Sequence, residues 1–123
     1  MKFCHTVLVV KDLDASIKFY QDVVGLPVKA RQPAGPGAEL AFMGDGDTLV
    51  ELLCAKPGFY DESKEVGNGV ALGFVVNSLE NKLSLLRDGG YATDGAIASP
   101  APGMQFLFAK DPDGYNVQFI AKQ

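Results

Sequence analysis

Two residues stand out because their side chains could bind a metal ion or move a proton. His5 is the only histidine of the chain, and Glu51 lies within the apolar run LVELL. Burying a charged carboxylate is costly unless it is paired, hydrogen-bonded or bound to a metal, so Glu51 needs a partner. A neutral imidazole and a carboxylate together suit zinc, nickel, iron or manganese. The alternative is that His5 and Glu51 only hydrogen-bond inside a half-buried sheet.

Several further side chains could contact a small ligand. Arg31 could meet an anionic group, although an exposed arginine at a strand edge needs no ligand. Phe42, Met104 and Phe106 could line an apolar cleft, although core packing is the default role of such residues. Tyr60 could add ligand selectivity from a loop, because loops commonly carry binding residues.

The composition is that of an ordinary globular protein. The chain has 123 residues, of which 47% are hydrophobic and 21% charged, so it can bury the core of one domain. A net charge of −4 opposes binding to nucleic acid and to anionic membranes. The N-terminal sequence MKFCHTVLVVKDLD lacks the apolar stretch of a signal peptide, and no run reaches the length of a membrane span. We therefore expect a cytoplasmic protein.

The chain has two cysteines, Cys4 and Cys54. Two cysteines without a secretory signal do not make a disulfide framework, and they indicate a reducing compartment. We expect both thiols to pack within strands. No arrangement of the Ser-His-Asp or Cys-His kind is indicated, because the single histidine would have to serve any such role.

The first half of the chain has the pattern of a strand, a helix and three further strands. Asp12 can cap a helix that Gly25 ends, and the helix has one apolar stripe. The stripe consists of Leu13, Ile17, Tyr20 and Val24. Strands are expected at 3–10, 26–32, 38–43 and 48–54, with a loop at 33–37 and a turn at 44–47.

The same order returns after a polar connector at 56–68. A strand at 69–76, a helix capped by Ser78, a weaker strand at 91–99, a loop at 100–103 and hairpin strands at 104–109 and 115–121 are expected. The first helical stripe maps onto Leu79, Leu83 and Leu86 at a constant offset of 66 residues. Two copies of a βαβββ unit are therefore predicted. A ferredoxin-like or other α+β arrangement is the alternative.

Strand alternation indicates which polar side chains share a face. His5 lies on the same face as Val7, and Glu51 lies opposite the apolar side of its strand. Gln118 falls on one face of the last strand, opposite Phe119. If each helix covers one side of its sheet, the other side must carry His5, Glu51 and Gln118.

Two segments resemble the vicinal oxygen chelate superfamily, which includes glyoxalases and bleomycin-resistance proteins. The opening HTVLVVKDLDASIKFYQDVVGLPV is similar to the first module of that superfamily, and the ending FAKDPDGYNVQFI is similar to its closing module. The resemblance implies an α+β fold of two tandem βαβββ modules that form a glyoxalase-type half-barrel cleft. It places module one at about 1–55 and module two at about 69–123 of a single domain. It also implies a homodimer.

The resemblance further assigns candidate ligands. In metal-dependent members four side chains converge, one from the first and one from the fourth strand of each module. The matching positions are His5 and Glu51 in module one, and Ala71 and Gln118 in module two, where glyoxalase-like members carry a histidine and a glutamate. Alanine cannot bind a metal, and the Gln118 amide oxygen is a weak ligand that cannot serve as a proton-transferring base. The candidate metal ligands are therefore His5, Glu51 and Gln118, with Glu51 as the catalytic base.

Two function classes remain open. One is a glyoxalase/bleomycin-resistance-like protein that binds a small organic molecule in the cleft between its modules, with or without a degenerate metal site. The other is a lyase or isomerase resembling glyoxalase I, which needs one divalent ion of nickel, zinc, manganese or iron as a Lewis acid. Ala71 and Gln118 favour the first class and count against dioxygenase and fosfomycin-resistance activities. The His5 and Glu51 pair keeps the second class open.

Overall fold

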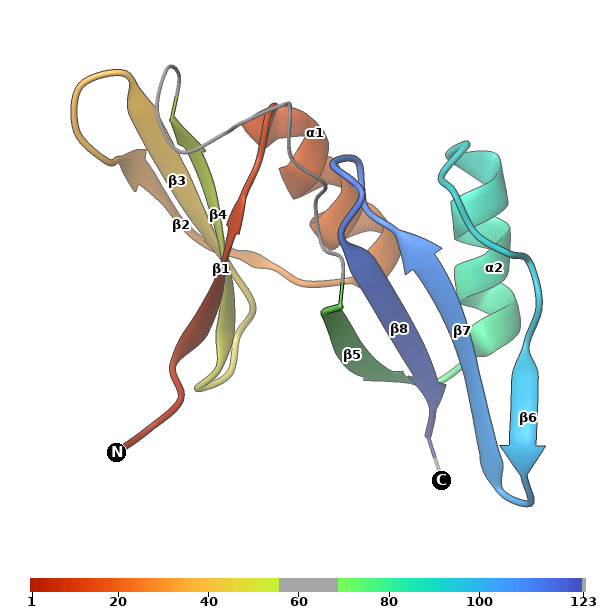
Figure 1. Ribbon diagram of the computed structural model, residues 1–123. Helices are drawn as coiled ribbons and strands as arrows, with labels where there is room; N and C mark the ends of the chain where they lie inside the picture. The colour runs from red at the N-terminus through yellow and green to blue at the C-terminus, as the bar shows by residue number, and fades with distance from the viewer. Residues whose placement is uncertain (56–68, 123) are drawn as a thin grey trace. The chain divides into compact units, whose positions relative to one another are not determined.

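A computed structural model of the chain describes residues 1–55 and 69–122 (Figure 1). The expected connector at 56–68 lies outside the described residues. Among the described helices, none is long and apolar enough to cross a membrane.

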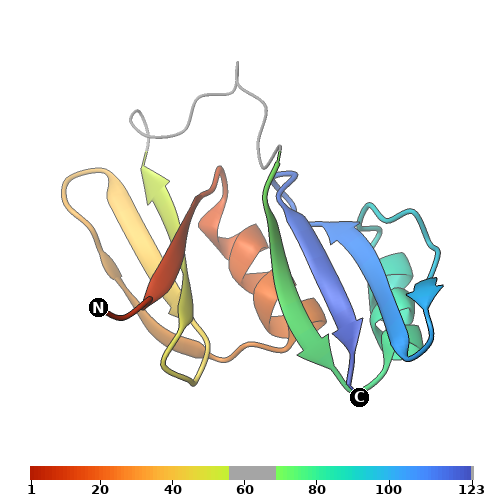
Figure 2. The ribbon, with the colours of Figure 1, turned by 60° about the horizontal axis from the view of Figure 1, so that its bottom comes forward.

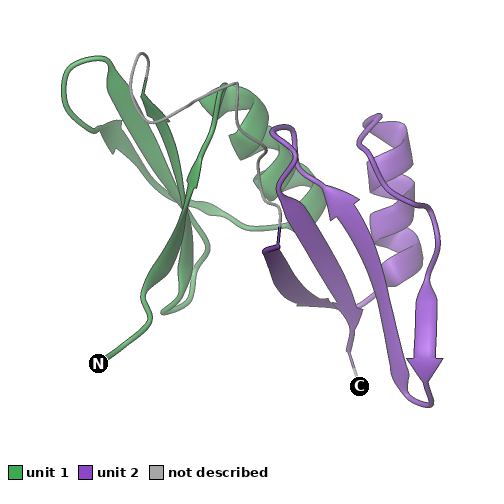
Figure 3. Ribbon diagram, viewed as in Figure 1, with its two compact units in different colours: residues 1–64 green, residues 65–123 purple. Residues whose placement is uncertain are grey.

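The chain divides into two compact units. Unit 1 covers residues 1–64 and unit 2 covers residues 65–123 (Figure 3). The elements of unit 1 are β1 (His5–Val9), α1 (Leu13–Lys18), η1 (Phe19–Val24), β2 (Val28–Pro33), β3 (Ala38–Met43) and β4 (Leu49–Ala55). The elements of unit 2 are β5 (Ala71–Val76), α2 (Leu79–Asp88), β6 (Ala98–Ala101), β7 (Met104–Lys110) and β8 (Asn116–Ala121).

Each unit has one four-stranded mixed sheet with the same topology. The strand order is β1-β4-β3-β2 in unit 1 and β5-β8-β7-β6 in unit 2. The first and last strands of each unit run parallel, and the other neighbours run antiparallel. In unit 1 the helix α1 packs against β3 and β4, and in unit 2 α2 packs against β7 and β8 (Figure 2). The predicted α+β fold of tandem βαβββ modules is confirmed.

The first helical segment begins as predicted but ends in a different type of helix. Asp12 accepts a hydrogen bond from the backbone amide of Ala15 at 3.1 Å, which caps α1. The segment continues as the π-helix η1, where the amides of Gly25 and Leu26 both donate to the carbonyl of Tyr20. Gly25 adopts a left-handed φ of 95° and ends the segment. The whole predicted stripe is buried.

The second helix follows the predicted pattern more closely. The Ser78 hydroxyl oxygen accepts a hydrogen bond from the amide of Asn81 at 3.1 Å. Leu79 and Leu86 are buried, whereas Leu83 is half-buried. The helix therefore turns a narrower apolar stripe toward its sheet than α1 and η1 do.

The weaker strand predicted at 91–99 is wrong in position. Its start makes only an isolated bridge between Thr93 and Ala109, and Gly95 then takes a left-handed φ of 71°, which interrupts the extended chain. The strand β6 begins at Ala98 and runs through part of the predicted loop at 100–103. It pairs with β7 at its two ends, with a register irregularity between them that accommodates a proline, which has no amide hydrogen to donate.

Each sheet buries one face against its own helix. The buried residues on these helix-facing sides of the strands include Leu8, Ala41, Met43, Val50 and Leu52 in unit 1, and Val76, Leu107, Ala109, Val117 and Phe119 in unit 2. We call the opposite side of each sheet its open face, because no helix of the same unit covers it. Alternation along the strands places the candidate polar residues on this open face, as the sequence predicts.

Candidate functional site

His5 and Glu51 contact each other on the open face of unit 1. Val7 of β1 lies opposite Glu51 of β4, and His5 precedes Val7 by two residues on the same face. Nε2 of His5 lies 3.3 Å from Oε1 of Glu51. Because the Glu51 side chain is only 12% exposed, its carboxylate needs a partner, and the imidazole supplies one. The structure brings together the two residues that the sequence singled out.

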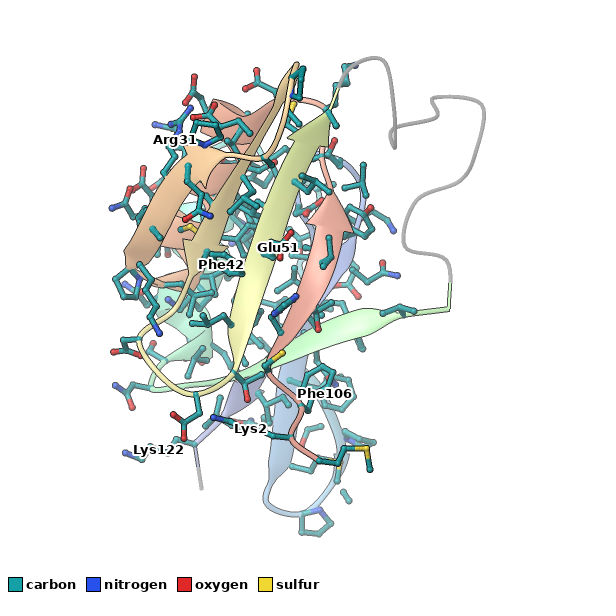
Figure 4. The ribbon with its side chains drawn as sticks, turned by 90° about the vertical axis from the view of Figure 1, so that its left-hand side faces the viewer. Lys2, Arg31, Phe42, Glu51, Phe106 and Lys122 are labelled. Carbon is teal, nitrogen blue, oxygen red and sulfur yellow. The ribbon has the colours of Figure 1, made fainter. Side chains whose placement is uncertain are left out.

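Phe42 forms a wall beside this pair. It lies opposite Glu51 on the neighbouring strand β3, and Figure 4 shows both side chains on this face of the sheet. Its ring meets the imidazole of His5 edge-on, with the ring centroids 5.6 Å apart. Edge-to-face packing of this kind favours one orientation of the imidazole. Phe42 thereby helps to hold His5 toward Glu51.

The second ring nitrogen of His5 also has a partner, which the sequence analysis missed. Sγ of Cys4 lies 3.3 Å from Nδ1 of His5, and Cys4 is an exposed free cysteine. The expectation that both thiols pack within strands is wrong for Cys4, because β1 begins only at His5. Cys54 is half-buried, and its thiol donates to the backbone carbonyl of Lys11 at 3.6 Å. The dipeptide Cys4-His5 was the signal that could have revealed the contact.

Unit 2 has the same positions but different chemistry. Ala71 begins β5 as His5 begins β1, and Gln118 lies opposite Gly73 on β8 as Glu51 lies opposite Val7. Gln118 also lies opposite a phenylalanine, Phe108 of β7. Residue 73 is a glycine, so no side chain stands opposite Gln118 on β5, and a Cβ atom there would lie 3.6 Å from Oε1 of Gln118. The open face of unit 2 thus carries a neutral amide where unit 1 carries a carboxylate.

The donor atoms at these positions do not fit a four-ligand catalytic metal site. His5 and Glu51 are usual ligand types, Ala71 has no donor atom, and Gln118 offers only a neutral amide oxygen. Within residues 1–55 and 69–122, no three His, Cys, Asp or Glu side chains are grouped so as to hold a metal ion. Without a metal ion, His5 and Glu51 can still form hydrogen bonds and transfer a proton.

Arg31 lies on the other face of unit 1. It pairs with Ala41, whose side chain is buried against the helix. Its guanidinium donates to both carboxylate oxygens of Glu39, at 2.8 and 3.1 Å, and to Oδ1 of Asp14 at 2.7 Å. The hydrogen bonds from Arg31 hold the pKa of Glu39 below its usual value. Two carboxylates thus engage Arg31, and the structure does not bring it to His5 and Glu51.

A hollow of about 330 Å³ lies in unit 2. Phe108 forms part of its wall, and Thr93, Lys110 and Asn116 supply polar groups. These groups are fixed, because Lys110 donates to Oδ1 of Asn116 at 2.8 Å and Thr93 donates to the carbonyl of Phe108 at 2.8 Å. An apolar wall with a few positioned polar groups is the usual composition of a small-molecule site, at the lower end of the usual volume.

The remaining predicted contact residues fall into two groups. Met104 and Phe106 both lie on β7, where the Phe106 ring packs edge-on against Phe108 with centroids 5.5 Å apart. They therefore belong to the open face of unit 2 with Gln118. Tyr60 lies outside the described residues. The sequence analysis missed Phe108, although its place four residues after Met104 put it on the same strand face.

Comparison with known proteins agrees with this arrangement. Residues 2–119 match the family model of the Glyoxalase/Bleomycin resistance protein/Dioxygenase superfamily. The lactoylglutathione lyase of Haemophilus influenzae is 33% identical, with 98% of this chain and 92% of that protein covered. The lactoylglutathione lyase of Neisseria meningitidis serogroup A is 30% identical, with 100% of this chain and 92% of that protein covered.

A solved structure supports the same assignment. The trypanothione-dependent glyoxalase I of Leishmania major superposes with a TM-score of 0.75 at 26% identity, covering 98% of this chain and 86% of that protein. A family match over nearly the whole sequence, relatives of similar length and a doubled βαβββ topology all agree. The chain therefore belongs to the Glyoxalase/Bleomycin resistance protein/Dioxygenase superfamily.

Proposed function

We propose that this protein binds a small organic molecule at the open faces of its sheets and does so without a catalytic metal. The observation that carries the proposal is the chemistry of unit 2. Ala71 and Gln118 stand at the positions equivalent to His5 and Glu51. Neither side chain can act as a general acid or base at neutral pH. A superfamily mechanism that needs ligands from both modules finds no donor atom at Ala71 and only a weak one at Gln118.

Apolar side chains at both faces support a ligand with an apolar part. Phe42 borders the His5 and Glu51 pair in unit 1, and Phe106 and Phe108 border Gln118 in unit 2. The hollow of about 330 Å³ beside Phe108 could take a group of a few rings or chains. An uncharged or cationic molecule suits a chain with a net charge of −4 better than an anion does.

Thermal melting with a panel of amphipathic aromatic compounds, including metal-free bleomycin, tests the proposal. A ligand that binds only the folded protein increases the free energy of unfolding, by about 2.7 kcal/mol at a concentration 100 times its Kd. The added stability raises Tm. We expect one compound to raise Tm while mass spectrometry recovers it unchanged. The substitutions Phe42→Ala and Phe106→Ala should weaken that shift. Arg31→Gln, on the other face of unit 1, is the matched control and should leave it unchanged.

Two results would contradict the proposal. If the protein converts the bound compound to a product over repeated catalytic cycles, it is an enzyme and not only a binding protein. A complete absence of stabilisation across the panel, with the chain folded, would remove the support for a binding protein of this ligand class.

A metal-dependent lyase is the second candidate. The contact between His5 and Glu51 favours it, as do the relatives named lactoylglutathione lyase. On this reading Glu51 is the catalytic base, His5, Glu51 and Gln118 hold the ion, and nickel, zinc, manganese or iron is the cofactor. Metal analysis after incubation with each ion, followed by an assay for lactoylglutathione formation, tests it. Retention of about one ion per site that is lost in His5→Ala and Glu51→Ala would support this candidate.

We also propose a cytoplasmic homodimer of one-domain chains, in which module one spans about 1–55 and module two about 69–123. The resemblance to the superfamily supports the homodimer and the two modules, and a chain with only two cysteines suits a reducing cytoplasm. Light scattering after size-exclusion chromatography measures the mass in solution, and a monomer across the micromolar range would contradict the dimer. Fractionation of cells that express the chain tests the compartment.

A further inference from the structure

The hollow of about 330 Å³ in unit 2 is bordered by one cationic and one anionic side chain, Lys110 and Asp94. Lys110 lies on the open face of β7, on the same side as Phe108. Asp94 follows Thr93, which bridges to Ala109 of the same strand. Among the residues that the structure describes, neither charged side chain forms an ion pair. The wall of the hollow therefore carries two separate charges whose sum is zero.

Both charged groups keep hydrogen-bonding capacity for a ligand. An ammonium group has three hydrogens, and Lys110 donates one of them to Oδ1 of Asn116 at 2.8 Å. Oδ1 of Asp94 accepts a hydrogen bond from the amide of Ala96 at 3.2 Å, and no described group donates to Oδ2. The hollow thus offers a donor at Lys110 and an acceptor at Asp94.

Hydrogen bonds to the backbone hold this part of unit 2 in place. The side-chain amide of Asn116 donates to the carbonyl of Val70 at 3.0 Å, so the partner of Lys110 is itself fixed. The Thr93 hydroxyl donates to the carbonyl of Phe108 at 2.8 Å and joins the following segment to β7. Groups that are held in position before a ligand arrives lose less conformational entropy when it binds.

The walls select the polar group that a ligand can carry. The Phe108 side chain is 39% exposed, so an aromatic ring can pack against it. A carboxylate would be attracted by Lys110 but repelled by Asp94, and an organic cation would meet the reverse. An uncharged amide suits both groups, because its carbonyl oxygen accepts from the ammonium and its N–H donates to the carboxylate.

We propose that the hollow in unit 2 binds an uncharged aromatic amide, with its ring on Phe108, its carbonyl oxygen at Lys110 and its N–H at Asp94. The inference rests on the proposed function, since it names the class of small organic molecule that this open face takes. Lys110 and Asp94 are then specificity-determining residues, and no covalent bond forms or breaks.

Three compounds of the same shape test the proposal. At neutral pH benzamide is uncharged, benzoate is an anion and benzamidinium is a cation. Titration of the full chain, followed by two-dimensional amide NMR, gives both the Kd and the residues whose signals move. We expect benzamide to bind at least roughly threefold more tightly than either ion, because it alone satisfies both polar groups. The moving signals should belong to residues 92–94 and 108–110.

Substitutions of the two charged residues should reverse the charge preference. Lys110→Met removes the donor, so the affinity for benzamide should fall at least roughly fivefold and benzamidinium should become the tightest ligand. Asp94→Asn leaves the cation alone, so benzoate should become the tightest ligand. Lys122→Met and Asp88→Asn are the matched controls, since they make the same charge changes in unit 2 outside the hollow. Both controls should keep the order of the parent chain.

Several results would overturn the inference. They are equal or tighter binding of benzoate or benzamidinium to the parent chain, an unchanged order in both charge variants, and shifts confined to residues outside the hollow. Binding of none of the three compounds up to the limit of their solubility would overturn it as well. The proposed function survives these results if a larger amphipathic compound still raises Tm through Phe42 or Phe106, and it fails with the inference if no compound does.

Discussion

Glu51 and Gln118 occupy the same position in the two sheets. Each lies on the last strand of its unit, opposite a phenylalanine on the antiparallel neighbouring strand. On the parallel neighbouring strand, each lies opposite the third residue of that strand. The two side chains have almost the same shape and differ in charge. Glu51 has an imidazole partner, whereas the equivalent first-strand position in unit 2 is Ala71. One fold therefore holds an imidazole–carboxylate pair in unit 1 and a neutral polar group in unit 2.

Restoring the ligating side chains in unit 2 should create metal affinity. We expect the double variant Ala71→His with Gln118→Glu to bind nickel or zinc at least tenfold more tightly than the parent chain, which corresponds to about 1.4 kcal/mol. The reason is that all four superfamily positions then carry nitrogen or carboxylate donors. Competition against a chromophoric chelator measures the affinity. Val75→His, on the same face of β5, is the matched control, and equal gains in both variants would contradict the prediction.

The ion pair of Arg31 with Glu39 should make a small, pH-dependent contribution to stability. The pKa of Glu39 is lowered in the folded chain from its ordinary 4.5, mainly by the Arg31 hydrogen bond. The stabilisation is therefore present above the ordinary pKa and disappears as the pH falls through the folded pKa. Urea unfolding of the parent chain and of Arg31→Met should differ at neutral pH and converge in acid. Salt should also reduce the difference, because these side chains are 40% and 44% exposed.

A carboxyl titration by NMR gives the control for this prediction. In Arg31→Met, the pKa of Glu39 should return toward 4.5, because its hydrogen-bond donor is gone. An unchanged Glu39 titration in the variant would show that another group lowers the pKa.

Removing either helix cap should destabilise the chain by a similar amount. Asp12 and Ser78 each accept a hydrogen bond from a first-turn backbone amide at 3.1 Å. Asp12→Ala and Ser78→Ala should each lower the free energy of unfolding by about 0.5–2 kcal/mol, measured by urea denaturation. Asp12→Asn and Ser78→Thr keep the acceptor and should retain most of the stability. Equal losses in the alanine and conservative variants would point to a cause other than capping.

The apolar stripe of α2 should have unequal importance along its length. Leu86 is fully buried, so Leu86→Ala should cost about 2–5 kcal/mol through lost burial and a residual cavity. Leu83 belongs to the same predicted stripe but is half-buried, and Leu83→Ala should cost less. Urea unfolding of both variants gives the comparison. Equal costs would mean that the stripe is buried uniformly in solution.

The helices and most strands could be predicted from the sequence because their signals are local. Asp12 and Ser78 cap the starts of their helices, and Gly25 ends the first helical segment, all through contacts within a few residues. Strand alternation places Glu51 and Gln118 on the open faces. The doubled pattern added a check that no single element provides, because a constant offset must hold for both helices.

The errors arise where contacts that the residue pattern does not reveal decide the structure. The π-helical turn η1 depends on the hydrogen bonds that the carbonyl of Tyr20 accepts from the amides of Gly25 and Leu26, which the period of the apolar stripe does not predict. The strand β6 depends on pairing with β7 rather than on its own residues. The exposed Cys4 depends on where β1 begins, and its contact with His5 follows from side-chain orientation, which strand alternation does not predict for a residue outside the strand.

The alternation of faces also bears on how the activity of such a chain can change. Residues that pack against the helix, such as Val117 and Phe119, stabilise unit 2, while Ala71 and Gln118 project from the opposite side of the same strands. An exchange on that side, such as histidine for alanine, leaves the packed interior intact. The chemistry of the open face can thus be lost or changed in one unit while the other unit and the packed cores stay the same.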